Sequence, residues 1–204
     1  GKSILPTPVI GMVGAIDEVE NSLEISAKLG NVLIALGQSN NFKAGWVGCS
    51  IYQEIINKKC DGAPPPINLE NEKKVIEILL KLNHQKLLTA AHDISDGGLL
   101  TTVCEMLFKY NLGLDINLPN NLIHYDSYDP LLQSWCFGED QARIIIATKD
   151  IKNVKLVLKE NNVDFFVLGE TNSSSNLNLR DVATISINDI KNLNDNTIPV
   201  MMCD

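Results

Sequence analysis

Short apolar runs alternate along this chain with longer segments of helical periodicity. The run Asn31 to Gly37, NVLIALG, and the run Ala142 to Thr148 are too short for helices and are typical of buried strands. Residues 68 to 83 follow three consecutive prolines and carry apolar residues on one face, a pattern typical of an amphipathic helix. This alternation predicts a sheet with helices packed on it.

The same patterns extend over the rest of the chain, without an internal repeat. Strands are expected over residues 9–14, 31–37, 86–91, 113–118, 142–148, 163–168 and 178–187. Helices are expected within residues 45–58, 68–83, 95–111, 129–135 and 150–161, and from residue 188 onward. We predict an α+β fold with a mixed sheet, rather than a strictly parallel doubly wound sheet.

Composition limits what the chain can bind. Its 204 residues are 45% hydrophobic, which suffices for a real core, and they carry a formal net charge of −8. Nonspecific binding to nucleic acid needs a surplus of lysine and arginine, and an anionic membrane repels a negatively charged chain. No apolar run approaches the roughly 20 residues of a membrane span, and the first residues lack a signal-peptide pattern. We expect a cytoplasmic chain with neither nucleic acid nor membrane as partner.

The cysteines show no pattern of metal binding. They form no Cys-x-x-Cys motif and no regular spacing with histidine, so we interpret them as ordinary thiols of a reducing compartment. The five are Cys49, Cys60, Cys104, Cys136 and Cys203.

The densest cluster of chemically unusual residues is the segment 91–99, AHDISDGGL, where an expected strand ends and an expected helix begins. Gly97 and Gly98 carry no side chains that would keep a ligand from the backbone N–H groups of the helix start, which attract anions. Asp93 can hold Mg²⁺ against phosphate oxygens, because this cation needs only one or two protein carboxylates. Ser95 can donate a hydrogen bond to a nucleotide. The segment predicts a magnesium and nucleotide site.

The same segment also has a purely structural interpretation. His92 and Asp93 can close a loop, Ser95 or Asp96 can cap the helix, and the glycines can permit tight packing against the sheet. A short Asp-x-Ser-x-Gly-Gly pattern is only moderately specific, so both interpretations stay open at this point.

Two further clusters lie at the starts of expected elements. In Phe137 to Arg143, FGEDQAR, either Glu139 or Asp140 can bind a cation or order a neighbouring loop, or the carboxylates can pair with Arg143 in a turn. We favour the turn, because solvated charge clusters are common. The glycine-rich segment GWVGCSIY leads into a helix for which Ser50 is the candidate N-cap.

Six segments, taken in order, resemble the synthetase component of the phosphoribosylformylglycinamidine synthase family. They are PTPVIGMVG, LG followed by GWVGCSIY, GAPPPINL, AAHDISDGGL, FGEDQAR and VLGET. This family belongs to the AIR-synthase-like superfamily, whose members pair an N-terminal domain with a C-terminal α+β domain. The resemblance implies that residues 15–204 form an AIR-synthase C-terminal-like domain. Residues 1–14 would be the tail of the preceding N-terminal-like domain.

The resemblance implies an ATP-dependent C–N ligase of de novo purine biosynthesis. ATP would phosphorylate the amide oxygen of formylglycinamide ribonucleotide, and ammonia from a glutaminase would displace the phosphate to give the amidine. Asp93 would bind Mg²⁺ and Ser95 the ATP or ADP, at an auxiliary nucleotide site. The implied partners are the N-terminal domains of the same enzyme, a glutaminase subunit and a small accessory subunit.

No residue of this chain is expected to be catalytic. The catalytic histidine of the family and most of its ATP and substrate contacts lie in the half that is absent here, so the fragment is expected to be inactive alone. One alternative is a structural or docking domain of the same enzyme, without a ligand of its own. Another is a domain of a sibling enzyme, such as a selenophosphate synthetase or a thiamine-phosphate kinase. The enzyme domain and the structural domain differ at Asp93 and Ser95, which bind a ligand only in the enzyme domain.

Overall fold

A mixed sheet forms the centre of the structure, a computed structural model that describes residues 9–37, 45–59, 61–122 and 129–203. Its seven strands lie in the order β2-β4-β1-β5-β3-β6-β7, and neighbours are antiparallel except for the parallel pair β3 and β6. The strands are β1 (Val32–Leu36), β2 (Ala90–Asp93), β3 (Gly113–Asp115), β4 (Ile144–Thr148), β5 (Phe165–Asn172), β6 (Asn176–Leu179) and β7 (Ala183–Ser186).

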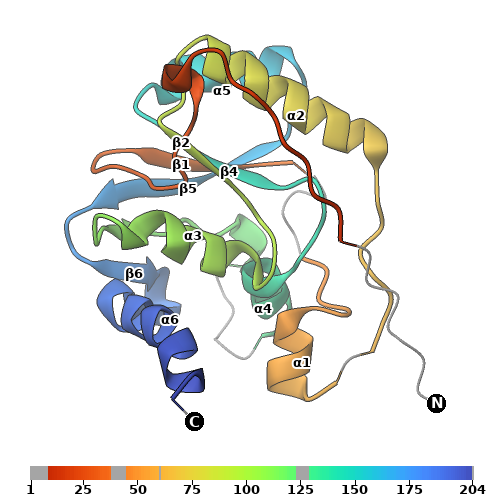
Figure 1. Cartoon of the computed structure of the whole chain (residues 1–204), viewed down its shortest axis with the longest axis vertical. Coiled ribbons are helices and arrows are strands. Elements are labelled where there is room, and N and C mark those ends of the chain that lie inside the picture. Colours follow the sequence, from red (N-terminus) through yellow and green to blue (C-terminus); the bar gives the residue numbers. More distant parts are fainter. Residues whose placement is uncertain (1–8, 38–44, 60, 123–128, 204) are drawn as a thin grey trace.

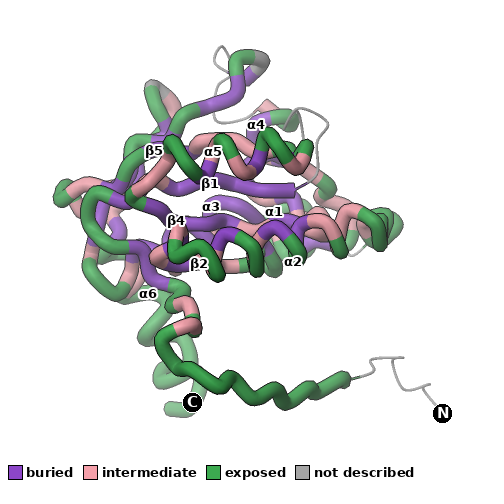
Figure 2. The backbone as a smooth tube through the Cα atoms, turned by 90° about the horizontal axis from the view of Figure 1, so that it is seen from above, coloured by how far each residue is buried: buried purple, intermediate pink, exposed green. Residues whose placement is uncertain are grey.

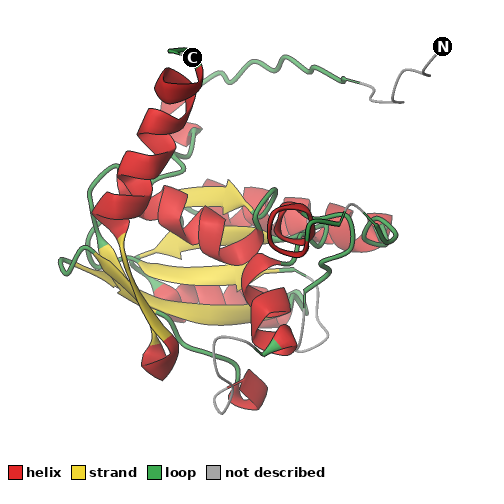
Figure 3. Ribbon diagram, turned by 90° about the horizontal axis from the view of Figure 1, so that it is seen from below, coloured by secondary structure: helices red, strands yellow, loops and turns green. Residues whose placement is uncertain are grey.

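Helices cover both faces of this sheet. In Figure 1, α2 and α5 lie on one face, and α3 and α4 lie on the other. The sixth helix, α6, packs against α3 at its start and then projects from the body of the molecule (Figure 3). The helices are α1 (Ile51–Asn57), α2 (Leu69–His84), α3 (Gly98–Phe108), α4 (Pro130–Phe137), α5 (Ile151–Glu160) and α6 (Ile187–Met201). The predicted α+β class is confirmed.

The central strands are apolar because both of their faces are buried. Successive side chains of a strand point to opposite faces, so Leu33 and Ala35 join the core beneath α3 and α4, while Ile34 and Leu36 join the core beneath α2 and α5. All four are at most 1% exposed. Figure 2 shows this buried layer at the centre of the molecule. Polar groups with a chemical role therefore have to lie at the strand ends.

Most of the elements expected from the sequence are present, with shifted ends. The helix expected over residues 68–83 is α2, and the strands expected over residues 31–37 and 142–148 are β1 and β4. The strand expected from residue 86 begins only at Ala90, because Lys86 has a positive φ of 55° in the turn that follows α2.

Two expected strands are wrong. Residues 9–14 form no strand and are exposed, with Val13 fully so, and within the described structure they pair with no strand (Figure 2). The strand expected over residues 178–187 is instead divided between β6 and β7, which pair antiparallel across a 3-10 turn at Arg180–Val182. That turn contains neither glycine nor proline, so its sequence lacks the two strongest local signals of a reversal.

Among the described residues, no helix combines the length and the apolar character that crossing a membrane requires.

Shortening a side chain of a strand that is buried on both faces should destabilise the fold. Ile146 on β4 is 0% exposed, and Ile146→Ala should lower the free energy of unfolding by about 2–5 kcal/mol, through lost burial and the cavity that remains. Urea unfolding followed by circular dichroism measures this loss. The control is Leu156→Ala on α5, where the side chain is 50% exposed and the loss should be about 0.5 kcal/mol. Equal losses in the two variants would contradict the two-sided burial of β4.

Candidate functional site

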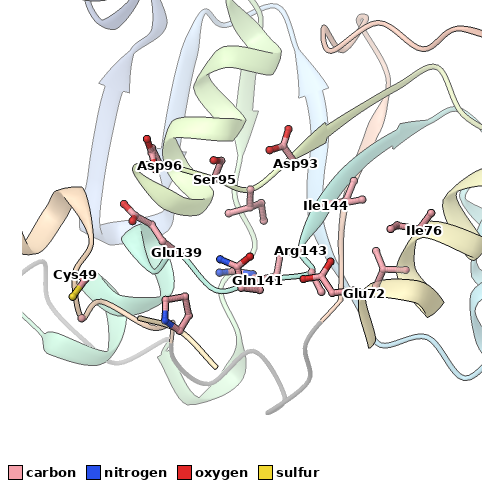
Figure 4. Close-up of a pocket in the computed structure, with 15 residues that line it drawn as sticks. Cys49, Glu72, Ile76, Asp93, Ser95, Asp96, Glu139, Gln141, Arg143 and Ile144 are labelled. Carbon is pink, nitrogen blue, oxygen red and sulfur yellow. The ribbon is translucent and has the colours of Figure 1, made fainter. Parts of the chain in front are cut away.

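A cavity of about 320 Å³ lies where β2 ends and α3 begins. Figure 4 shows the turn Asp93–Asp96 on one side of it, Cys49 and Glu139 on a second side, and Glu72 and Ile76 of α2 on a third. The lining residues are Gly48, Cys49, Pro65, Glu72, Val75, Ile76, Asp93, Ile94, Ser95, Asp96, Glu139, Gln141, Ala142, Arg143 and Ile144. Five separate segments of the chain thus contribute to one space.

Asp93 and Ser95 both line this cavity. The Asp93 carboxylate is 72% exposed, and its Oδ1 lies 3.3 Å from Nδ1 of His92. The backbone between them is held by Ile94, whose N–H donates to the carbonyl of Arg143 at 2.9 Å. Ser95 is exposed, and within the described structure its hydroxyl group makes no hydrogen bond. Both side chains are therefore available to a ligand in the cavity.

The two glycines adopt the left-handed backbone that favours this residue, with φ of 81° at Gly97 and 73° at Gly98. A Cβ at Gly98 would lie 2.5 Å from the carbonyl carbon of Phe137, so α3 approaches the end of α4 too closely for any side chain. The structural interpretation of Gly98, tight packing, therefore holds, although the neighbour is a helix end rather than the sheet.

The cap of α3 differs from the expected one. The N-cap residue is Gly97, without a side-chain cap, rather than Ser95 or Asp96. The Gly97 N–H donates instead to Oε1 of Glu139 at 2.8 Å. This expectation was wrong because the acceptor comes from a residue 42 positions away, which local capping patterns do not include. A protein carboxylate thus already occupies one of the donors suggested for a phosphate.

Glu139 and Asp140 also hold the segment that precedes α1. The same Oε1 of Glu139 accepts a second hydrogen bond from the Ile51 N–H at 3.0 Å. Oδ2 of Asp140 accepts from the Trp46 N–H at 3.0 Å, and the Glu139 N–H donates to the Trp46 carbonyl at 2.9 Å. Of the functions considered for these acids, ordering a neighbouring loop is the one observed.

The expected pairing with Arg143 is also present. Nη1 of Arg143 lies 3.0 Å from Oδ2 of Asp140, and both side chains are largely buried. Burial lowers the pKa of the Arg143 guanidinium from its ordinary value, and the Asp140 carboxylate opposes this shift. This contact with Asp140 occupies the one guanidinium among the residues that line the cavity, so it is not free to bind a ligand.

Ser50 is the N-cap of α1, as predicted, and its Oγ accepts from the Gln53 N–H at 3.2 Å. The two buried cysteines are not reactive nucleophiles. Burial raises the pKa of Cys104 and of Cys136 to about 12, so both remain protonated thiols. Cys49 lines the cavity as a free thiol and Cys203 is free and exposed, while Cys60 lies outside the described residues.

The charge of the cavity favours a cation over a bare anion. Four carboxylates face it against the single paired guanidinium, and Glu72 among them was not foreseen, because at the start of α2 it reads as an ordinary first-turn acid. Carboxylate and hydroxyl oxygens suit Mg²⁺. In the part of the chain that the structure describes, no three His, Cys, Asp or Glu residues are grouped to hold a metal by themselves. Phosphate or water oxygens would have to complete the shell.

Comparison with known proteins defines the class of this domain. The family model described as "AIR synthase related protein, C-terminal domain" matches residues 28–182, and the chain belongs to this family. Its relatives include the phosphoribosylformylglycinamidine synthase subunit PurL of Rhodopseudomonas palustris, 32% identical over 99% of this chain and 26% of the relative. PurL of Pelagibacter ubique is 37% identical over 92% of this chain and 24% of the relative.

Solved structures share the fold. T. maritima PurL complexed with FGAR superposes with a TM-score of 0.67 at 19% identity, over 85% of this chain and 30% of that one. T. maritima PurL complexed with ATP gives 0.60 at 18% identity, over 83% and 27%. The chain spans about a quarter of the length of the curated relatives it matches.

The close contact at Gly98 can be separated from its backbone conformation. Gly98 and Gly30 share a φ of 73°, but a Cβ at Gly30 meets no heavy atom within 4 Å. Gly30→Ala should therefore lower the free energy of unfolding by about 1–2 kcal/mol, the strain of a left-handed backbone at alanine. Gly98→Ala should lower it by about 1–3 kcal/mol more, because α3 must also move away from α4. Urea unfolding of both variants measures the difference, and equal losses would show that the contact is not close.

Proposed function

We propose that this chain is the C-terminal domain of the ATP-dependent synthetase that converts formylglycinamide ribonucleotide to formylglycinamidine ribonucleotide. The observation that carries the proposal is the match to PurL over 99% of the chain, with the segment AHDISDGGL at the cavity. The domain architecture follows from this. Residues 15–204 form the C-terminal-like domain, and residues 1–14 belong to the preceding N-terminal-like domain, which agrees with the exposure of the apolar residues 9–13.

Within this function the cavity binds Mg²⁺ with ATP or ADP as an auxiliary site. Asp93 holds the cation, because its exposed carboxylate faces a cavity in which negative charge prevails. Ser95 donates to the nucleotide through its free hydroxyl group. Gly97 and Gly98 follow the turn that lines the cavity without lining it themselves, and their assignment to the nucleotide rests on the motif. The ATP complex of T. maritima PurL, which shares this fold, supports a nucleotide as the ligand.

The domain acts in the cytoplasm with other parts of the enzyme rather than alone. No residue of the chain is assigned a catalytic role, and the isolated fragment is inactive without the N-terminal domains. A PurLQS structure from Thermotoga maritima shares the fold with a TM-score of 0.57, which supports a larger assembly that includes a glutaminase and a small accessory subunit.

One observation favours a second candidate, a purely architectural domain of the same enzyme. The Gly97 N–H that a phosphate would use is already bound by Glu139, so the turn is satisfied without a ligand. Under this alternative Asp93 and Ser95 are ordinary surface residues.

Calorimetric titration of the purified chain with ADP, with and without Mg²⁺, separates the two candidates. We expect binding that requires Mg²⁺ and that Asp93→Ala weakens by about tenfold or more, because the cation loses its protein carboxylate. The matched control is Asp164→Ala, since Asp164 is exposed but does not line the cavity. Absence of binding in the unmodified chain would favour the architectural domain, and equal binding by the two variants would overturn the role of Asp93.

A further inference from the structure

One side-chain oxygen joins three segments that border the cavity. Oε1 of Glu139 accepts from Gly97 at the start of α3 and from Ile51 at the start of α1. Glu139 itself follows Gly138, the residue that ends α4. The segments it joins are 42 and 88 positions away from it in the sequence. This carboxylate therefore links the starts of α1 and α3 directly, beside the stacking of Tyr52 of α1 on Phe137 at the end of α4.

We propose that Glu139 is a positioning residue, which sets the shape of the cavity by fixing the turn Asp93–Gly97 against the segment that leads into α1. Its effect on a ligand rests on the function proposed above. Its effect on the backbone does not, and can be measured without any ligand. Glu139 need not touch the nucleotide, because it acts through the two N–H groups that it holds.

Among the polar contacts of the described residues, only those of Glu139 join the start of α1 to the start of α3. Asp140 accepts a hydrogen bond from the Trp46 N–H, at the far end of the segment that leads into α1. Its other hydrogen bond comes from Arg143. The start of α3 has no side-chain cap of its own. Each hydrogen bond to a charged acceptor contributes more than one between neutral groups, so two on one oxygen form a firm link.

The task requires an acceptor oxygen rather than a negative charge. Both hydrogen bonds end on Oε1, and Oε2 makes none within the described structure. The amide oxygen of glutamine has the same position and still accepts both hydrogen bonds, although more weakly than a carboxylate, whereas alanine removes the acceptor. Glu139→Gln and Glu139→Ala therefore separate positioning from a role that depends on charge, such as direct binding of a cation.

Amide hydrogen exchange measured by NMR tests the link in the 204-residue chain. In Glu139→Ala the amides of Gly97 and Ile51 should exchange about tenfold faster or more, while Glu139→Gln stays within about threefold of the original rate. Unchanged exchange at Ile34, in the central strand, shows that the fold is intact. Glu160→Ala, which removes an exposed glutamate at the end of α5, is the matched control and should change neither amide.

Titration with ADP and Mg²⁺ then measures the effect on the cavity. Glu139→Ala should weaken binding by about tenfold, and Glu139→Gln should restore it. Unchanged exchange in Glu139→Ala, or an equal effect of glutamine and alanine on exchange, would overturn the proposal. If the unmodified chain binds no nucleotide, the proposed function fails, and the exchange rates still decide the role of Glu139.

Discussion

The burial of β1 and β4 on both faces is the constraint on which the rest of the structure depends. Helices cover each side of these strands, so their side chains alternate between two dry cores, and neither strand carries a charged residue. The groups that can do chemistry are therefore displaced to the strand ends. The cavity forms there because β2 ends at Asp93 and β4 begins directly after Arg143.

The loops at this edge are held by polar contacts that substitute for a hydrophobic core. The FGEDQAR segment contributes a buried ion pair, two carboxylate anchors for the approach to α1, and the acceptor at the start of α3. Such contacts are directional, so they define a shape more strictly than apolar packing does. Among the charged groups that line the cavity, Glu139 and Arg143 are held by protein partners, whereas the Asp93 carboxylate stays exposed.

Some polar groups of the site are used by the protein itself, whereas others are available to a ligand. The anion-attracting N–H of Gly97 is satisfied by the protein itself, yet the Ser95 hydroxyl group and the Asp93 carboxylate face the cavity. Membership in the AIR synthase related C-terminal domain family accounts for the fold. Family membership alone does not assign a ligand, because function depends on the site rather than on the fold.

Local sequence determined the elements whose signals are local: the apolar runs of β1 and β4, the start of α2 after the prolines, the Ser50 cap, and the placement of Asp93 and Ser95 where a strand ends. Only the tertiary structure decided the cap of α3, the reversal at Arg180–Val182 and the exposure of residues 9–14. The cap of α3 depends on Glu139, 42 positions away in the sequence, and the strand before the reversal, β6, pairs with the distant strand β3. Periodicity reports which side of an element is apolar, whereas hydrogen bonds between distant segments follow from how those elements pack.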